Sequence, residues 1–313
     1  MHILTPRKEL IVPRRFGIGM EGWLRLQCIR PDGRVRYDTG FFRNTLLTAG
    51  LNELGTRTSV ITHCQVGTDN TAASPIQTSL LGHVAGTNSI QSTVTGQAST
   101  APYFGWKRNV YRFAAGTVAA NLNEVGVGWD NSGSTLLSRA LILDPTSGNP
   151  TTVTPLADEL LDVTYELRYY APTSDVLGPQ GNFGGTLYDT TTRAAIATDN
   201  AWSGNIGLEM KVVNFSGWSY TGALGAVTAS PSGIAEQALA ASYTNGAYSN
   251  NSLNRDFTIN VGVTEWNRTT KSVRITCTGG VLQCEFDNGG VGITKTSSQT
   301  MTMTFNVAWA ARP

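Results

Sequence analysis

The chain has 313 residues, of which 40% are hydrophobic and 14% are charged, so it can bury a substantial core as two domains or as one large β domain. Its formal net charge of +1 provides no general attraction to nucleic acid or to an anionic membrane surface, and we expect neither partner. No apolar run approaches the roughly 20 residues of a membrane-spanning helix, which excludes membrane insertion by a helix. Residues 1–15 lack the apolar core of a secretory signal peptide, and synthesis in the cytoplasm is expected.

Residues 1–16 are expected to form an extended N-terminal arm. Two prolines among basic residues make the segment poor material for a helix. Leu10, Ile11 and Val12 are too few for a core of their own, but they could pair with the sheet edge of a neighbouring subunit. A frayed, solvated terminus is the alternative.

A β-hairpin and one short helix are predicted next. Apolar and polar residues alternate over 23–29 and are followed by a Pro-Asp-Gly turn signal. Residues 44–54 predict the helix, because Asn44 can cap it, three leucines share one face, and Gly55 can end it. Further short strands are predicted at residues 60–66, 110–113, 122–129 and 138–143.

The clearest periodicity of the chain lies in residues 151–170, where side chains alternate with a period of two. The apolar face consists of Leu161, Val163, Tyr165, Leu167 and Tyr169, and the face expected to be solvated consists of Asp162, Thr164, Glu166, Arg168 and Tyr170. Residues 299–309 repeat this pattern, and the two segments align without a gap. Weaker matches, of residues 125–127 with 261–263 and of residues 73–75 with 229–231, follow in the same chain order. Together these matches predict a tandem duplication.

We therefore expect a mainly β protein of two related antiparallel β-sandwich lobes, with the short helix in the first lobe. A single large jelly roll or barrel is the alternative. The first lobe is expected to span residues 17–171 and the second lobe residues 204–313. Residues 172–203 are rich in Gly, Thr, Pro, Asp and Asn, and are expected to form a linker or an excursion between the lobes.

The sequence contains none of the common catalytic or nucleotide-binding motifs, and its three histidines lack metal-ligand spacing. No catalytic residue, cofactor or metal is therefore expected. A carboxylate pair for glycoside hydrolysis could be suggested by Asp158, Glu159, Asp162 and Glu166, but the last two hold outward positions on one strand, which indicates an ordinary solvated face. The four cysteines are interpreted as reduced core residues, although Cys277 and Cys284 could face each other across a hairpin and form a disulfide.

Aromatic residues of the second half are interleaved with Gly, Ser and Asn, which is typical of a lectin-like or partner-binding surface and also of loops that cover the end of a sandwich. If the second lobe carries a binding site, Trp202, Trp218 and Tyr220 are the candidates for contact with a glycan or a partner.

Four further segments stand out together: residues 41–55 (FFRNTLLTAGLNELG), 64–75 (CQVGTDNTAASP), 123–129 (NEVGVGW) and 138–144 (SRALILD). They resemble virion structural proteins of tailed bacteriophages, a group often labelled tail or tail-fibre associated, over roughly residues 23–170. The resemblance implies a non-enzymatic assembly component of the virion tail region, such as a collar, baseplate, tip or fibre-attachment piece, that is made in the host cytoplasm and binds other virion proteins.

A capsid decoration protein and a glycan-cleaving tail enzyme are the alternatives to this function. Contact with a host-surface glycan is a further expectation. The predicted duplication also favours a homo-oligomer, with a trimer as the first choice, because three chains would present six similar lobes.

Overall fold

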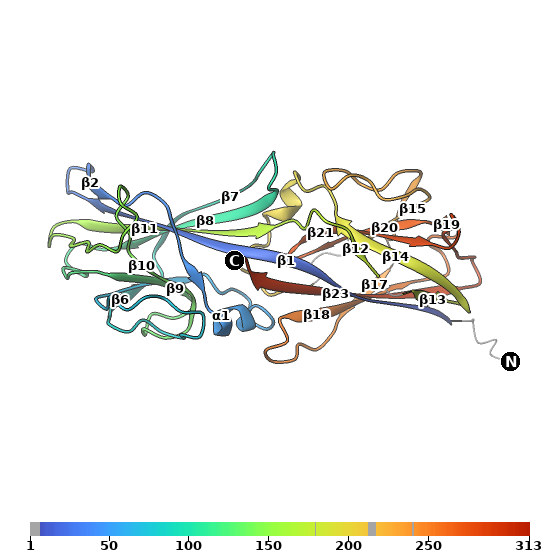
Figure 1. Cartoon of the computed structure of the whole chain (residues 1–313), viewed down its shortest axis with the longest axis horizontal. Coiled ribbons are helices and arrows are strands. Elements are labelled where there is room, and N and C mark those ends of the chain that lie inside the picture. Colours follow the sequence, from blue (N-terminus) through green and yellow to red (C-terminus); the bar gives the residue numbers. More distant parts are fainter. Residues whose placement is uncertain (1–6, 179, 212–216, 240) are drawn as a thin grey trace.

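The computed structural model describes the backbone of residues 7–178, 180–211, 217–239 and 241–313, and the side chains of these residues from Phe16 onward. The chain is mainly β, with one short α-helix among the described residues, as the sequence predicts. Its body is elongated, and two lobes lie end to end (Figure 1). No helix in the described part of the chain is long and apolar enough to cross a membrane.

One sheet runs through both lobes, with the strand order β17-β18-β23-β1-β11-β8-β7 and with β2 and β3 added to β1. Its strands are β1 (Arg7–Ile29), β2 (Val35–Asp38), β3 (Phe42–Arg43), β7 (Ile90–Gln97), β8 (Phe104–Phe113), β11 (Leu160–Tyr170), β17 (Ser242–Asn245), β18 (Asn254–Val261) and β23 (Thr300–Ala311). The long strand β1 joins the lobes, because residues 19–29 pair antiparallel with β11 whereas residues 7–20 pair parallel with β23.

Each lobe also has a sheet of its own. The first lobe contains β4-β10-β9-β5-β6, and the second contains β12-β14-β21-β20-β15-β16 with β13 paired to β14. The strands of the first lobe's sheet are β4 (Thr45–Leu46), β5 (His63–Gly67), β6 (His83–Thr87), β9 (Glu124–Gly128) and β10 (Leu136–Leu141). Those of the second are β12 (Val176–Leu177), β13 (Gly181–Phe183), β14 (Thr186–Ala194), β15 (Gly217–Tyr220), β16 (Ala235–Gln237), β20 (Ser272–Cys277) and β21 (Gly280–Asp287).

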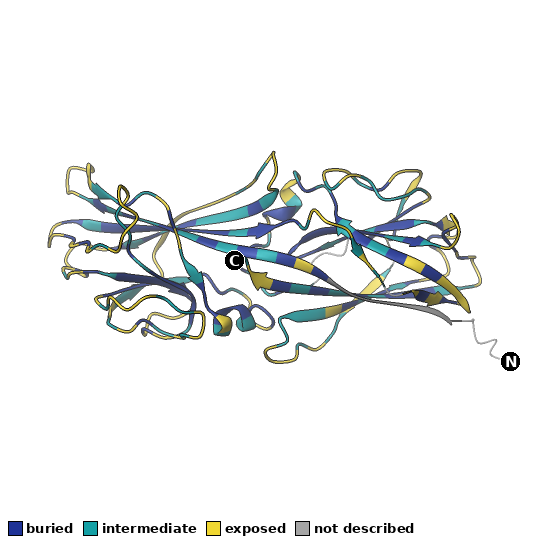
Figure 2. Ribbon diagram, in the orientation of Figure 1, coloured by how far each residue is buried: buried dark blue, intermediate teal, exposed yellow. Residues whose placement is uncertain are grey.

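The remaining elements are short: the helix α1 (Thr48–Glu53), the 3-10 turn η1 (Asn200–Trp202) and the paired strands β19 (Thr269–Thr270) and β22 (Ile293–Thr294). The main hydrophobic cluster contains residues from both lobes. Figure 2 shows that buried residues run along the strands, whereas exposed residues gather in the loops.

The two lobes repeat one topology. The strands β7-β8-β11 and β6-β5-β9-β10-β4 of the first lobe have counterparts β17-β18-β23 and β16-β15-β20-β21-β14 in the second, in the same chain order and all antiparallel. β11 and β23 therefore hold equivalent places, and so do the loops that contain residues 73–75 and 229–231. The weaker match of residues 125–127 with 261–263 is wrong, because it aligns β9 with the end of β18. The repeated topology is what a tandem duplication produces.

The N-terminal segment is not a free arm. Residues 7–16 belong to β1, where Leu10 lies in register with Met303 and Ile11 with Thr304 of the same chain, whereas Val12 falls where the register shifts. The shift coincides with Pro13, which has no backbone N–H to donate to a neighbouring strand. The sheet edge that this segment extends is therefore the chain's own β23, which corrects the expectation of an edge on a neighbouring subunit.

Residues 172–203 are not a linker, which is a second correction. They contain β12, β13, β14 and η1, and β14 pairs with β21 inside the second lobe. Gly and Thr are frequent in this segment, but alternate side chains of β14 are buried, as in a strand with one face toward the core. The second lobe therefore begins well before residue 204.

The helix is shorter than predicted. It begins at Thr48, and Leu47 precedes it without a side-chain capping bond, because residues 45–46 pair with β10 instead. Gly50 has a packing role here, since a Cβ at this position would clash with the backbone of Leu137. The cost of a glycine inside a helix is offset by this close approach to β10.

Candidate binding surface

The outer face of β1, β8 and β11 carries alternating arginine and aromatic side chains. The antiparallel registers place Trp23 beside Glu166, and Glu166 beside Arg108. Two residues further along the three strands, charged and aromatic side chains again lie side by side across the sheet. We call the whole set the arginine–aromatic strip, and its members are Trp23, Arg25, Phe41, Phe104, Trp106, Arg108, Arg168, Tyr170 and Arg312.

The arginines of the strip lie over aromatic rings at distances at which a cation and a π system attract each other. The distances from guanidinium carbon to ring centre are 4.7 Å for Arg168 over Trp23, 4.8 Å for Arg168 over Phe104, 4.9 Å for Arg108 over Trp106, 5.0 Å for Arg108 over Phe41 and 3.8 Å for Arg312 over Tyr170. Stacking of this kind fixes the planes of both partners. The strip is thus a preformed surface of the residue types that dominate binding interfaces.

Glu166 anchors the centre of the strip. It accepts hydrogen bonds from the Nε atoms of Arg108 and Arg168, at 3.0 and 2.6 Å, and is only 2% exposed. Asp162 is buried in the same way and is held by two hydrogen bonds of 2.7 Å from Arg112. The expectation of a solvated face is therefore wrong, because arginines of the neighbouring strand β8, and Arg168 of β11 itself, cover these carboxylates.

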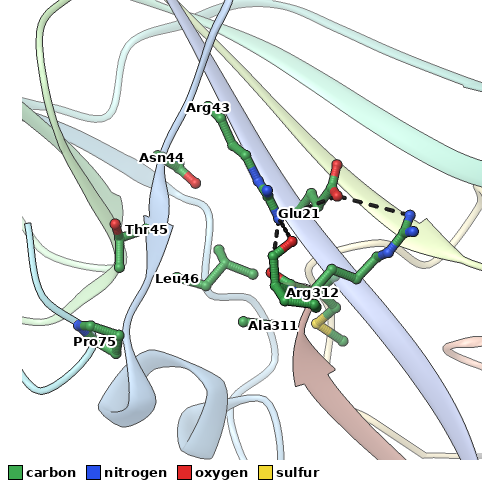
Figure 3. A pocket seen from close by; sticks show the side chains of 10 residues that line it. Glu21, Arg43, Asn44, Thr45, Leu46, Pro75, Ala311 and Arg312 are labelled. Atoms are coloured by element: carbon green, nitrogen blue, oxygen red, sulfur yellow. Dashed lines mark hydrogen bonds and ion pairs between the residues drawn. The ribbon is translucent and has the colours of Figure 1, made fainter.

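At one end of the strip, Glu21 organises a clamp between the lobes (Figure 3). Its carboxylate accepts a hydrogen bond of 2.7 Å from the hydroxyl of Tyr170 and forms ion pairs with Arg43 at 3.3 Å and Arg312 at 3.8 Å. Burial and the hydrogen bond to Glu21 raise the pKa of Tyr170, so its hydroxyl keeps the proton that it donates.

Arg43 completes the clamp by holding the segment that follows β23. Its Nη2 atom donates to the backbone carbonyl oxygens of Arg312 and Pro313, at 2.8 and 2.9 Å. The backbone N–H of Arg312 donates in turn to the carbonyl of Met20, at 2.9 Å. Residues that follow the last strand of the second lobe are thereby fixed to the first lobe.

In the described part of the chain, three hollows flank this segment, and one of them, of about 520 Å³, lies against Leu253 and Trp309. The other two border Glu21 or Tyr170 of the clamp. The smaller, of about 380 Å³, is lined by the clamp residues together with Asn44, Thr45 and Pro75 (Figure 3). The larger, of about 590 Å³, lies where β11 ends, and its lining residues are Gly17, Gly19, Ala101, Pro102, Tyr103, Tyr170, Ala171, Pro172, Thr173 and Arg312. Both volumes fall in the range of small-ligand sites. No periodic pattern in the sequence indicates either hollow, because each is built from the ends of several strands.

The aromatic residues predicted to contact a glycan do not form an exposed group. Trp202 is 1% exposed and donates its indole N–H to the carbonyl of Ala195 at 3.0 Å. Tyr220 is also buried, in β15, whereas Trp218 is half-buried with the guanidinium of Arg274 5.4 Å from its ring centre. Trp202 and Tyr220 are core residues, which corrects the prediction, because a buried ring offers no face to a sugar.

The cysteines confirm the main interpretation and exclude its alternative. All four are free and buried. In the hairpin of β20 and β21, Cys277 lies opposite Gly280 and Cys284 lies opposite Val273, so the two thiols do not face each other. Among the described residues, no group of three or more His, Cys, Asp or Glu side chains is placed to hold a metal ion.

Three of the four segments that carry the phage resemblance meet in a buried network in the first lobe. Glu124 and Arg139 are fully buried, and Arg139 Nε donates to Glu124 at 2.7 Å. Arg139 also donates to the carbonyl of Thr71 at 2.9 Å, and Glu124 accepts from the N–H of Gly82 at 2.6 Å. This network fixes the long loop between β5 and β6 to the sheet, so these segments have a structural role.

The chain matches no protein-family model, no curated protein and no solved structure. Its function is therefore inferred from its own residues and geometry.

Proposed function

We propose that the chain is a non-enzymatic structural protein of a tailed-bacteriophage virion, located in the tail region, that acts through contacts with other virion proteins. The observation that carries the proposal is β1, which completes the sheet of both lobes with one unbroken strand. A force on one lobe therefore reaches the other through a hydrogen-bonded strand and not through a flexible loop. Such a body suits a component that holds a fixed distance between its neighbours.

Further contacts across the junction of the lobes support this interpretation. Arg43 of the first lobe holds the backbone of residues 312–313, and Trp309 of β23 donates a hydrogen bond to the carbonyl of Leu51 in α1. Arg255 of β18 also donates to the carbonyl of Gly55 at 3.2 Å. Polar contacts at several points resist bending of one lobe against the other.

The glycan-cleaving alternative receives less support from the geometry. Glycoside hydrolysis requires two carboxyl groups about 5 to 9.5 Å apart on either side of the scissile bond. The larger hollow has no carboxylate side chain among its lining residues, and the smaller has Glu21 alone, already paired with two arginines. These hollows favour binding over cleavage.

The repeated topology of the lobes supports an assembly in which the chain forms a homo-oligomer, with a trimer as the first choice. Three chains would offer six similar lobes, and closed symmetry reuses one interface. Such a ring would join neighbours of threefold and sixfold symmetry in the tail.

The proposal is tested on purified virions of a phage that encodes the chain. Mass spectrometry should detect the protein in the particle, and immunogold labelling should place it on the tail. Absence from the particle would refute the proposal, and labelling of the capsid shell would favour the decoration protein. Release of reducing ends from host capsule by the purified protein would instead establish the enzyme.

A further inference from the structure

The larger hollow has a floor of bare backbone. Gly17 and Gly19 lie in β1 on the face of the arginine–aromatic strip, and a Cβ built on Gly17 would meet no atom within 4 Å. The space above the strand is therefore open at this point. At Gly19 the opposite holds, because a Cβ would clash with the aliphatic stem of Arg312, which crosses the strand there. The lack of a side chain at Gly17 thus leaves the hollow open, and the lack of one at Gly19 lets the stem of Arg312 lie along one side of it.

Among the described residues that line this hollow, Arg312 alone is charged. Its guanidinium lies over the ring of Tyr170 at 3.8 Å, which fixes its plane, and its ion pair with Glu21 is long, at 3.8 Å. Among the described contacts, its side chain donates no hydrogen bond. A guanidinium presents a fork of N–H donors that matches a carboxylate in two places. The hollow therefore offers an oriented cation with unused donors, and the carboxylate paired with it, Glu21, lies 3.8 Å away and outside the lining residues.

The other lining residues indicate what would carry the carboxylate. Pro102, Tyr103 and Pro172 supply rings, and Thr173 and Tyr103 supply hydroxyl groups. The ten lining residues include no Leu, Ile, Val, Met or Phe, the side chains that would hold the apolar anchor of a bound peptide. The flat ring of Tyr103 and the apolar pyrrolidine rings of Pro102 and Pro172, beside hydroxyls, fit the C–H face and the hydroxyl edge of a sugar.

We propose that the hollow of Gly17, Tyr103 and Arg312 binds a carboxylate-bearing sugar, a uronic or sialic acid, of a host-surface polysaccharide. The carboxylate pairs with the guanidinium of Arg312, and the sugar ring rests on the glycine floor between the lining rings. The ligand class follows from the hollow itself, whereas the host surface as its source rests on the proposed function.

The test uses the purified full chain and four probes in titration calorimetry: a galacturonic acid trisaccharide, a sialylated trisaccharide, and the carboxyl-reduced form of each. At least one acidic probe should bind, and its reduced form should bind about 10-fold more weakly or worse, because only the charge-assisted hydrogen bonds are lost. The acidic probe that binds identifies the type of sugar.

Two variants test the position of the site. Arg312→Gln removes the cation, and Gly17→Leu places a side chain on the open floor, where a Cβ would meet no atom within 4 Å; each should weaken binding of the acidic probe about 10-fold or more. Arg34→Gln is the matched control, because Arg34 is a highly exposed arginine in the β1–β2 turn, and it should bind as the unchanged chain does. If Arg312→Gln loses its fold, as judged by thermal unfolding, Gly17→Leu still decides the question.

The proposal is overturned if no acidic probe binds, if the reduced forms bind equally well, or if Gly17→Leu binds like the unchanged chain. Binding of a tri-glutamate peptide in place of the sugars would also overturn it, in favour of a protein partner. Virion labelling does not depend on this site. If immunogold labels the tail but no acidic sugar binds, only the proposed ligand is refuted. If the protein binds the sugar but is absent from virions, only the proposed function is refuted.

Discussion

The indole N–H of Trp309 donates a hydrogen bond to the backbone carbonyl of Leu51, 2.8 Å away, and so joins β23 of the second lobe to α1 of the first. The ring of Trp309 is buried and stacks on Tyr248 with 5.7 Å between ring centres. The contact buries a large apolar surface and also supplies a hydrogen-bond donor to a carbonyl near the end of a helix. It is therefore a point at which the junction of the lobes can be weakened by one substitution.

Trp309→Phe should lower the free energy of unfolding by about 1–3 kcal/mol, because the carbonyl of Leu51 stays buried without a donor. Trp309→Ala should lower it by about 3–5 kcal/mol, since it also leaves a cavity. Urea unfolding followed by fluorescence and circular dichroism measures both. Ile76→Ala is the control, because that side chain is 85% exposed and should change stability by less than about 0.5 kcal/mol. Equal stability of Trp309→Phe and the unchanged chain would contradict a structural role for the bond.

The parallel pairing of β1 with β23 can be tested by cross-linking. Positions 9 and 302 are partners in the register, so cysteines introduced together as Glu9→Cys and Thr302→Cys should form a disulfide within one chain on mild oxidation. The product should migrate as a monomer on a non-reducing gel. The native thiols are buried and should not interfere.

Glu9→Cys with Thr300→Cys is the out-of-register control and should cross-link more slowly. A disulfide-linked dimer of the in-register variant would show that the strand pairs with a neighbouring copy, as the sequence alone suggested for Leu10, Ile11 and Val12.

The alternation of apolar and polar residues predicted those strands in which the burial of a side chain follows from its position along the strand. Leu161 to Tyr169 and Met301 to Trp309 alternate along single strands, and their apolar faces are buried as expected. The same pattern could not show that Glu166 is covered, because Arg108 reaches it from β8, at a position set by sheet register. Alternation shows which residues of a strand share a face of the sheet. It does not show which side chains of a neighbouring strand cover that face.

The features missed by the sequence all depend on contacts between distant segments. Nothing near Asn44 indicates that residues 45–46 pair with β10, so helix-capping rules extended α1 too far. Trp202 follows a Gly- and Thr-rich segment typical of loops, yet its ring packs where Gly280 leaves space in β21. The larger hollow exists because β11 ends while β1 continues, which is a property of topology and not of composition.

The buried pair of Glu124 and Arg139 should be sensitive to removal of one partner. Glu124→Ala should lower the free energy of unfolding by about 3–5 kcal/mol, because it leaves the guanidinium of Arg139 buried and the N–H of Gly82 without its acceptor. The double variant Glu124→Leu with Arg139→Met should recover part of that loss, since no uncompensated charge remains. Denaturant unfolding of the single and double variants measures the coupling. A double variant that loses the sum of the single losses would show that the two side chains act independently.

The buried thiols should make stability fall at alkaline pH. Burial raises the pKa of Cys277 to about 11 and that of Cys284 to about 12, from an ordinary value of 9.0. In the unfolded chain these thiols ionise near their ordinary value, whereas in the folded chain they stay protonated. Their contribution to the free energy of unfolding is therefore complete below pH 9 and is lost as the pH rises toward 11 and 12.

Each of these thiols should account for a loss of about 2 kcal/mol across this range as an order of magnitude. Urea unfolding at pH 8 and pH 10.5 measures the loss, and Cys284→Ala is the matched variant because it removes one thiol and leaves every other titrating group in place. The alanine variant should start less stable at pH 8, since a buried sulfur is lost, but should lose less stability than the unchanged chain between the two pH values. An identical pH dependence of the two proteins would mean that Cys284 already ionises normally in the folded chain, and that solvent reaches a thiol that the structure places in the core.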